Sequence, residues 1–173
     1  LLYKEIKMNK LAVVLLGMGL SISGLTQAAG VGFVDLAKVV DSSSYLKQQN
    51  ASLNQSVKPT TTKLEQLGKE LDALRQKAET EGRNMKEADV QKLNQQYQTK
   101  LSEFNSTQQG LQTRVQGTLQ TMNNTFETRV KQAGEQLRQE NNLDFILNKN
   151  AAVAYDAKND LTDKMIQKVN AIK

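Results

Sequence analysis

The apolar residues of this chain form a long, regularly spaced middle region flanked by two shorter ends with denser apolar runs. From about Ser52 to Asn141, apolar side chains recur every three or four positions among polar ones. This is the repeat of an α-helix, continued far beyond the ~8–20 residues of an ordinary globular helix. A helix with so narrow an apolar stripe can bury only that stripe. The first stripe comprises Leu53, Val57, Leu64, Leu67, Leu71, Leu74 and Ala78, and the second runs from Val90 to Leu137.

A break in this pattern near residues 80–84 predicts a turn between two helices. Gly82 suits the position just after a helix, where the backbone is often left-handed. Asn84 and Glu87 are predicted to be the N-cap of the next helix and its capping-box partner. A short connection makes the two helices antiparallel neighbours, so the sequence predicts a coiled-coil-like helical hairpin. Pro59 removes one backbone donor from the first helix, and we expect a kink or a restart of the helix there.

Short apolar runs at both ends of the chain predict a small sheet. The strands are expected near 31–34, 143–147 and 151–155, paired in an antiparallel sheet. Asp35 is expected to cap a short helix after the first strand, and a last helix is expected to bury Leu161, Met165, Ile166 and Val169. So small a sheet buries little, and we therefore expect a homo-oligomer that shares it.

The sequence thus predicts a mainly α protein with a small β body, in which the hairpin projects from the sheet. The arm is expected at 45–119, and the oligomerisation body at 29–44 and 120–173. The residues expected to build that body are Phe33, Val34, Phe145, Ile146, Leu147, Val153 and Tyr155.

The start of the chain has the features of a secretory signal peptide. A short basic region begins at Met8, the apolar run Leu11–Leu25 follows, and Thr26-Gln27-Ala28 places small residues before a cleavage site. A membrane anchor is the alternative, but the run is shorter than the ~20 apolar residues that a span requires. We therefore expect residues 1–28 to be an upstream extension and a cleaved leader, with Met8 as the initiator.

The residue inventory argues against an enzyme. The chain has no Cys and no His, which removes thiol nucleophiles and the usual bases and metal ligands. Gly30 and Gly32 precede a strand, which is the wrong order for a phosphate-binding loop. We expect neither a cofactor nor a metal. The formal charge of +5 raises nucleic-acid binding as an alternative, but the arm mixes both signs of charge and the leader indicates export.

The order and spacing of the end segments resemble the Skp/OmpH family of periplasmic chaperones. The likeness covers the chain after the leader: the opening Val31-Gly32-Phe33-Val34-Asp35, the helical hairpin, and a closing segment from Asn142 to Thr162. The closing segment is the most specific part, with Asn142–Leu147 followed by Asn150–Tyr155 and then Asp160-Leu161-Thr162.

The resemblance implies a homotrimer in the periplasm of a Gram-negative-type bacterium. Its strands would form a central β-barrel, and its arms would enclose a cavity that holds unfolded outer-membrane proteins without ATP. Met85, Tyr97, Phe104 and Met122 are candidate client-binding residues, although each can instead belong to the apolar seam of the arm or to its turn. A structural coiled-coil spacer of the cell envelope is the alternative function.

The resemblance also implies basic arm tips that contact anionic lipid such as lipopolysaccharide. Here residues 69–92 carry six basic and six acidic side chains, so the tip is neutral and this balance argues against lipid contact. The basic residues are Lys69, Arg75, Lys77, Arg83, Lys86 and Lys92, and the acidic ones are Glu70, Asp72, Glu79, Glu81, Glu87 and Asp89.

Overall fold

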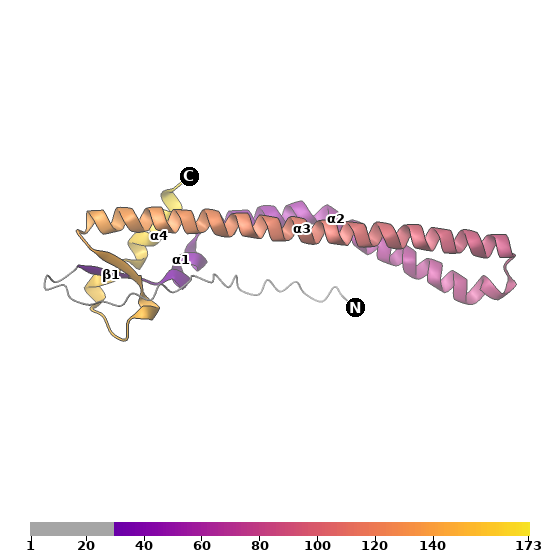
Figure 1. Ribbon diagram of the computed structural model, residues 1–173, viewed down its shortest axis with the longest axis horizontal. Helices are drawn as coiled ribbons and strands as arrows, with labels where there is room; N and C mark the ends of the chain where they lie inside the picture. Colours follow the sequence, from indigo (N-terminus) through magenta and orange to yellow (C-terminus); the bar gives the residue numbers. More distant parts are fainter. Residues whose placement is uncertain (1–29) are drawn as a thin grey trace. The chain divides into compact units, whose positions relative to one another are not determined.

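The computed structural model describes residues 30–173 and shows a mostly helical chain with a two-stranded sheet (Figure 1). The predicted leader and the initiator Met8 lie outside the described residues. The elements are β1 (Val31–Val34), α1 (Leu36–Ser42), α2 (Ser44–Glu81), α3 (Glu87–Glu140), β2 (Phe145–Asn148) and α4 (Thr162–Ala171), with 3-10 turns at Gly82–Asn84, Lys149–Ala151 and Ala157–Asn159.

The chain divides into two compact units. We call the described residues 30–42 and 127–173 the body unit, and residues 43–126 the hairpin unit. Helix α3 contributes residues to both units because the division falls after Phe126.

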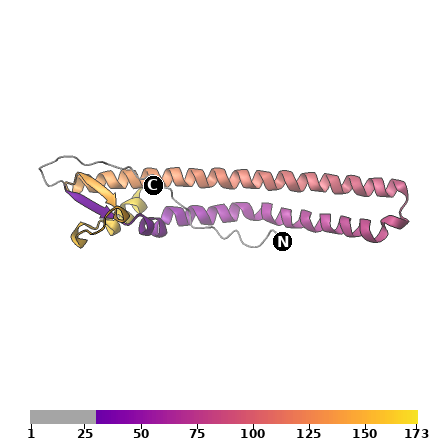
Figure 2. The same ribbon diagram turned by 60° about the horizontal axis from the view of Figure 1, so that its bottom comes forward.

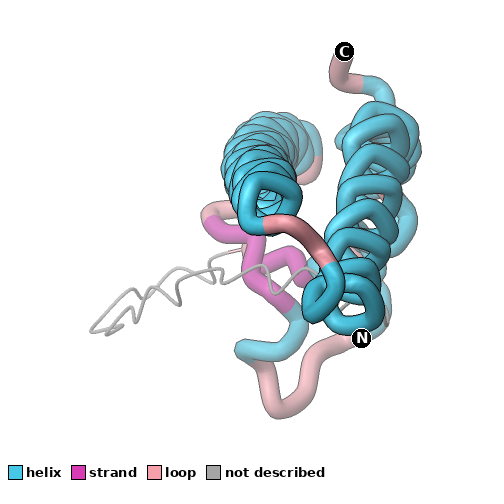
Figure 3. The backbone as a smooth tube through the Cα atoms, turned by 90° about the vertical axis from the view of Figure 1, so that its right-hand side faces the viewer, coloured by secondary structure: helices cyan, strands magenta, loops and turns pink. Residues whose placement is uncertain are grey.

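The hairpin unit begins at a buried serine cap. The Ser43 hydroxyl oxygen accepts from the Leu46 amide at 3.2 Å, which satisfies one of the free amides at the start of α2. Helices α2 and α3 lie side by side and antiparallel, joined by the short turn at Gly82–Asn84 (Figures 2 and 3). The predicted antiparallel pair of long helices is therefore present.

The turn uses a different geometry from the predicted one. Gly82 has φ −55° and ψ −34°, so it is right-handed, and the prediction of a left-handed glycine is wrong. The chain reverses instead at Met85, which is extended with φ −78° and ψ 149°. Helix α3 begins at Glu87, so Asn84 lies inside the 3-10 turn and is not the N-cap that we predicted. The right-handed 3-10 turn continues the helical sense of α2 and needs no left-handed residue.

The predicted restart of the first helix at Pro59 is also wrong. Helix α2 runs through this residue as one element of 38 residues. Proline removes one backbone donor, and the hydrogen bonds on either side of it hold the helix together.

The sheet of the body unit is parallel, so the predicted antiparallel sheet is wrong. Strand β1 pairs with β2 in the register Val31↔Phe145 to Val34↔Asn148. The two strands are separated in sequence by three helices and not by a hairpin turn, and such a crossover connection allows parallel pairing.

The chain enters β2 through a left-handed asparagine at the end of α3. Asn142 has φ 49°, its amide donates to the Gln139 carbonyl at 3.2 Å, and the Leu143 amide donates to the Arg138 carbonyl at 2.9 Å. These two bonds are those of a Schellman motif, which satisfies the last carbonyls of the helix. Residues 142–144 belong to the end of the helix and the link that follows it, so β2 starts at Phe145, two residues later than the predicted strand.

Gly32 allows the close approach on which this sheet depends. A Cβ atom at this position would lie 2.7 Å from Leu161 Cδ1 and 2.9 Å from Leu143 Cδ1. Both distances are shorter than real carbon contacts, so the two leucines occupy the space that any other residue would need. This role of Gly32 was not predicted from the sequence.

The strand predicted at 151–155 is absent. Ala151 ends a 3-10 turn, Val153 is fully exposed, and the Tyr155 ring stacks against Phe33 with the centroids 4.8 Å apart. The free edge of β1 is taken instead by residues 160–161, where the Leu161 amide donates to the Phe33 carbonyl at 2.7 Å. With both edges of β1 occupied, the segment 151–155 does not join the sheet.

Helix α4 supplies much of the core of the body unit. Leu161, Met165 and Val169 are buried and Ile166 is half-buried, on the face that the sequence predicts. At the N-terminus of α1, the Asp35 carboxylate accepts from the Lys38 amide at 3.0 Å, as predicted. The other buried apolar residues of this unit are Val34, Val39, Ala133 and Leu137.

Candidate functional site on the helical hairpin

The hairpin unit buries only a thin line of side chains. Six apolar residues of this unit are buried, and most of the remaining stripe residues are half-buried. The half-buried side chains keep apolar surface in contact with water along both helices, as expected of a pair of helices with a single narrow seam. The buried residues are Leu46, Leu53, Leu67, Leu93, Met122 and Phe126.

Two ion pairs join α2 to α3 and show which residues of the two helices lie opposite each other. Lys63 Nζ lies 2.8 Å from Glu103 Oε1, and Lys100 Nζ lies 2.6 Å from Glu70 Oε2. The pairing with Lys100 holds the pKa of Glu70 below its usual range, and the pairing with Lys63 does the same for the pKa of Glu103. Because the residue numbers rise in one helix as they fall in the other, these pairs belong to an antiparallel arrangement.

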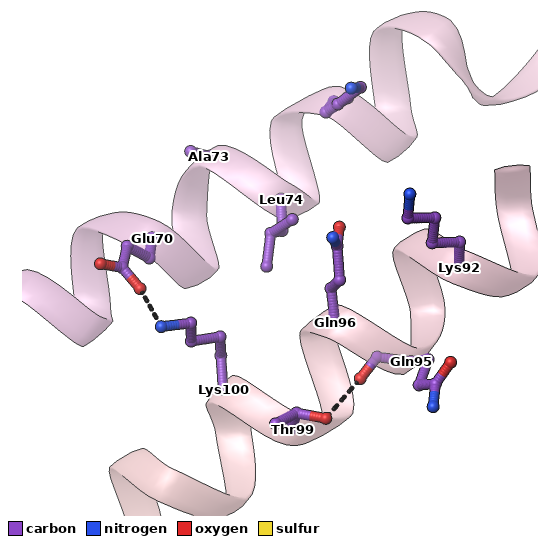
Figure 4. Close-up of a pocket in the computed structure, with 9 residues that line it drawn as sticks. Glu70, Ala73, Leu74, Lys92, Gln95, Gln96, Thr99 and Lys100 are labelled. Atoms are coloured by element: carbon purple, nitrogen blue, oxygen red, sulfur yellow. Dashed lines mark hydrogen bonds and ion pairs between the residues drawn. The ribbon is translucent and has the colours of Figure 1, made fainter.

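A groove opens between the two helices on the turn side of the Glu70–Lys100 pair (Figure 4). We call it the tip groove. Its volume is about 640 Å³. Leu74 and Gln96 point toward each other across the gap, and Lys100 reaches over to Glu70. The groove is lined by Glu70, Ala73, Leu74, Lys77, Lys92, Gln95, Gln96, Thr99 and Lys100.

The lysines of the tip groove differ in their partners. Lys100 is neutralised by Glu70, and this contact raises the pKa of the lysine. Lys77 and Lys92 form no ion pair with any residue of the described chain, 30–173. The groove therefore has two uncompensated positive charges on opposite helices, above an apolar floor at half-buried Leu74, and exposed Ala73 adds to its lining.

A second groove of about 340 Å³ lies farther from the turn, between the start of α2 and the middle of α3. Arg114 is its sole charged lining residue, and the others are Tyr45, Gln49, Thr113, Gly117, Thr118, Thr121 and Met122. Hydroxyl and amide groups dominate this lining, so it offers hydrogen bonds with little net charge.

The four predicted client-binding residues do not gather at one place. Met85, Tyr97 and Phe104 are half-buried, and Met122 is only 1% exposed. Met122 lines the second groove, whereas the other three line neither groove. Their role in binding stays a prediction.

The tip groove was not predicted from the sequence, although its signal was present there. Leu74 was assigned to the seam, and Lys77 and Lys92 were counted only as part of a neutral tip. The antiparallel register sets polar Gln96 opposite Leu74 (Figure 4). A stripe residue that faces glutamine meets a polar side chain across the seam, and this mismatch is readable once the register is known.

The residues predicted for the oligomerisation body fall into two groups in the body unit. Val34 is buried, and Phe33, Ile146, Leu147 and Tyr155 are half-buried. Phe145 is 39% exposed and Val153 is fully exposed. These two are the exposed large hydrophobic residues of the described chain.

The body unit also contains a small polar network around Asp160. Its carboxylate accepts from the Thr162 amide at 2.9 Å and from the Tyr155 hydroxyl at 3.3 Å, and Lys149 lies 3.5 Å from Asp35. The hydrogen bonds from Thr162 lower the pKa of Asp160. These bonds tie the segment after β2 to the start of α4.

Within residues 30–173, no cluster of three or more His, Cys, Asp or Glu side chains could bind a metal ion. The same described residues contain no helix with the length and apolar character of a membrane span.

These features define a class of protein that has a long antiparallel helical hairpin with grooves along it and a small α/β unit. The family model described as Outer membrane protein (OmpH-like) matches residues 30–169, and the chain belongs to this family. The resemblance found in the sequence is thus confirmed.

A solved structure has the same fold. It is that of a proposed outer membrane chaperone (OmpH-like) from Caulobacter crescentus CB15, with a TM-score of 0.70 and 18% sequence identity, and the match covers 91% of each chain. Curated protein sequences give no significant match to this chain.

Proposed function

We propose that this protein is an ATP-independent chaperone of the periplasm that binds unfolded outer-membrane proteins and prevents their aggregation. Membership of the OmpH-like family supports the general class. The proposal is carried by one observation: most stripe residues of the hairpin unit are only half-buried, so their apolar surface remains available to a partner.

Weak contacts at many points suit this function. Burial of part of an apolar side chain contributes about 0.5–1 kcal/mol, so each contact forms and breaks easily. Several such contacts acting together hold an unfolded chain while each segment of it stays mobile. Release then needs no nucleotide. This account requires no catalytic residue and no cofactor.

We further propose that the protein assembles as a homotrimer through the body unit, with the client held between the arms. Among the described residues, β2 has no strand on its outer edge, and the segment 151–155 forms no strand. The unpaired edge of β2 and the exposed side chains of Phe145 and Val153 are surface that a second copy of the chain can cover.

The assembly is tested by Phe145→Asp. A charge at a shared apolar surface should dissociate the trimer, whereas Phe145 is exposed enough in the single chain for the helices to remain folded. Light scattering gives the mass and circular dichroism the helix content. Gln116→Asp, an exposed position on α3, is the matched control. A Phe145→Asp protein that remains trimeric contradicts the proposed interface.

The chaperone function is tested with a urea-unfolded β-barrel membrane protein diluted into buffer. An equimolar amount of trimer should keep it soluble, as measured by light scattering. Failure to do so would remove the chaperone proposal and favour the alternative, a structural coiled-coil spacer of the envelope.

A further inference from the structure

The tip groove combines three features that are not found together in the second groove of the hairpin unit. It has an apolar floor at Leu74, two lysines without an ion-pair partner on opposite helices, and a volume of about 640 Å³. That volume falls within the range of sites that bind small ligands or side chains, ~300–1,000 Å³. The second groove is smaller and has one charged lining residue.

We propose that the tip groove binds a segment of unfolded polypeptide in which an apolar side chain is flanked by carboxylates. The apolar side chain would lie on Leu74, and the carboxylates would pair with Lys77 and Lys92. This inference rests on the proposed chaperone function and adds to it a defined site with a preference for one kind of client sequence.

Charge complementarity selects the occupant. Lys100 is already paired with Glu70 at 2.6 Å, so it offers little further attraction. Lys77 and Lys92 face the same groove from α2 and α3 without an acidic partner among residues 30–173. An acidic group that enters between them gains two contacts, and long lysine stems cover the apolar part of the ligand at the same time.

The surroundings of the groove favour a peptide over a membrane surface. Anionic membranes attract clusters of about four to eight basic residues without intervening acids. The tip instead has six basic and six acidic residues over 69–92, so its net attraction for a charged surface is weak. A short acidic and apolar segment needs only the local field of two lysines.

The test uses three labelled, unstructured peptides of equal length. One has Phe flanked by Asp and Glu, the second has Phe flanked by Asn and Gln, and the third has Ser between the acids. Fluorescence anisotropy with the purified protein should show that the first peptide binds most tightly, because it alone satisfies both the floor and the lysines.

Lys77→Gln combined with Lys92→Gln should weaken binding of the first peptide about 3- to 10-fold, and leave the second peptide unchanged. The matched control is Lys69→Gln combined with Lys86→Gln, which removes the same charge from exposed positions that do not line the groove. This control should change the binding of the first peptide by less than about 2-fold. Circular dichroism and light scattering verify that both double variants keep the fold and assembly of the original protein.

Two results would overturn the inference. Equal losses in the two double variants would show that binding follows the overall charge of the tip. Binding to vesicles of phosphatidylglycerol and phosphatidylcholine that depends on Lys77 and Lys92, without a preference for the first peptide, would make the groove a lipid site. The aggregation assay is read separately: protein that protects a client but shows no peptide preference refutes the tip site alone, and protein that binds the first peptide but protects no client refutes the chaperone proposal.

Discussion

The body unit and the hairpin unit bury their apolar residues in different ways. The body unit is the smaller of the two, yet it holds seven buried apolar residues, and Val39, Ala133, Leu137 and Val169 in it lose all solvent exposure. The longer hairpin unit holds six, and most of its other stripe residues stay half-buried. A dense core specifies one packing arrangement, whereas a thin seam leaves apolar surface for a partner.

The largest effect that tests this contrast is expected from truncation of a leucine in each unit. Leu137→Ala should lower the free energy of unfolding by about 2–5 kcal/mol, because it leaves a cavity in a packed core. Leu111→Ala, at a half-buried position in the hairpin unit, should cost less than half as much. Urea unfolding followed by circular dichroism measures both. Similar losses would show that the seam is as tightly packed as the body.

A smaller effect is expected from adding a methyl group to the sheet. Gly32→Ala should cost about 1–3 kcal/mol, since its Cβ would overlap Leu161 and Leu143. Gly82→Ala is the control: this glycine is right-handed and has no atom within 4 Å of a built Cβ, so alanine should stabilise by about 0.4–1 kcal/mol. Thermal unfolding compares the two. A Gly32→Ala protein as stable as the original would contradict the close packing of β1.

The hairpin could be predicted from sequence because its signals are local. Three- and four-residue spacing makes an apolar stripe wherever the chain is helical. Ser43 caps α2 through a hydrogen bond to Leu46, which is only three positions away in the sequence. The same holds for the face of α4 and the Asp35 cap of α1. Each of these depends on residues within a few positions of one another.

The sheet could not be predicted because its signals are not local. Strands β1 and β2 meet across more than one hundred residues, and their direction depends on a crossover that no short pattern encodes. The segment 151–155 has the composition of a strand, but residues 160–161 reach the edge of β1 instead. The tip groove was missed for the same reason, because the Leu74–Gln96 mismatch exists only in the register in which Lys63 meets Glu103 and Lys100 meets Glu70.

The next prediction concerns Gly110→Ala and Gly117→Ala, two substitutions within helix α3. Nothing lies within 4 Å of a Cβ built at Gly110 or Gly117, so alanine adds no clash and removes a residue that weakens helices. Each substitution should stabilise the hairpin unit by about 0.5–1 kcal/mol, measured by thermal unfolding. If these glycines keep the hairpin loose enough to adapt to clients, the double variant should also protect an unfolded β-barrel protein less well. A double variant that is no more stable would show that these positions are already constrained.

The smallest expected effect concerns the ion pairs that join α2 to α3. The pKa values of Glu70 and Glu103 are lowered by Lys100 and Lys63, so both carboxylates stabilise the folded hairpin at pH values above the unfolded value of ~4.3. This contribution is lost as the pH falls through the lower folded values. Because the side chains are partly exposed, salt should weaken it as well.

Glu70→Gln combined with Glu103→Gln isolates this contribution. At pH 7 the double variant should melt slightly below the original protein, and the difference should disappear as the pH is lowered below about 4. The control is Glu65→Gln combined with Glu79→Gln, since neither of these carboxylates forms an ion pair with any residue in the described part of the chain. A difference between original and double variant that persists unchanged at low pH would mean that Glu70 and Glu103 act through packing and not through charge.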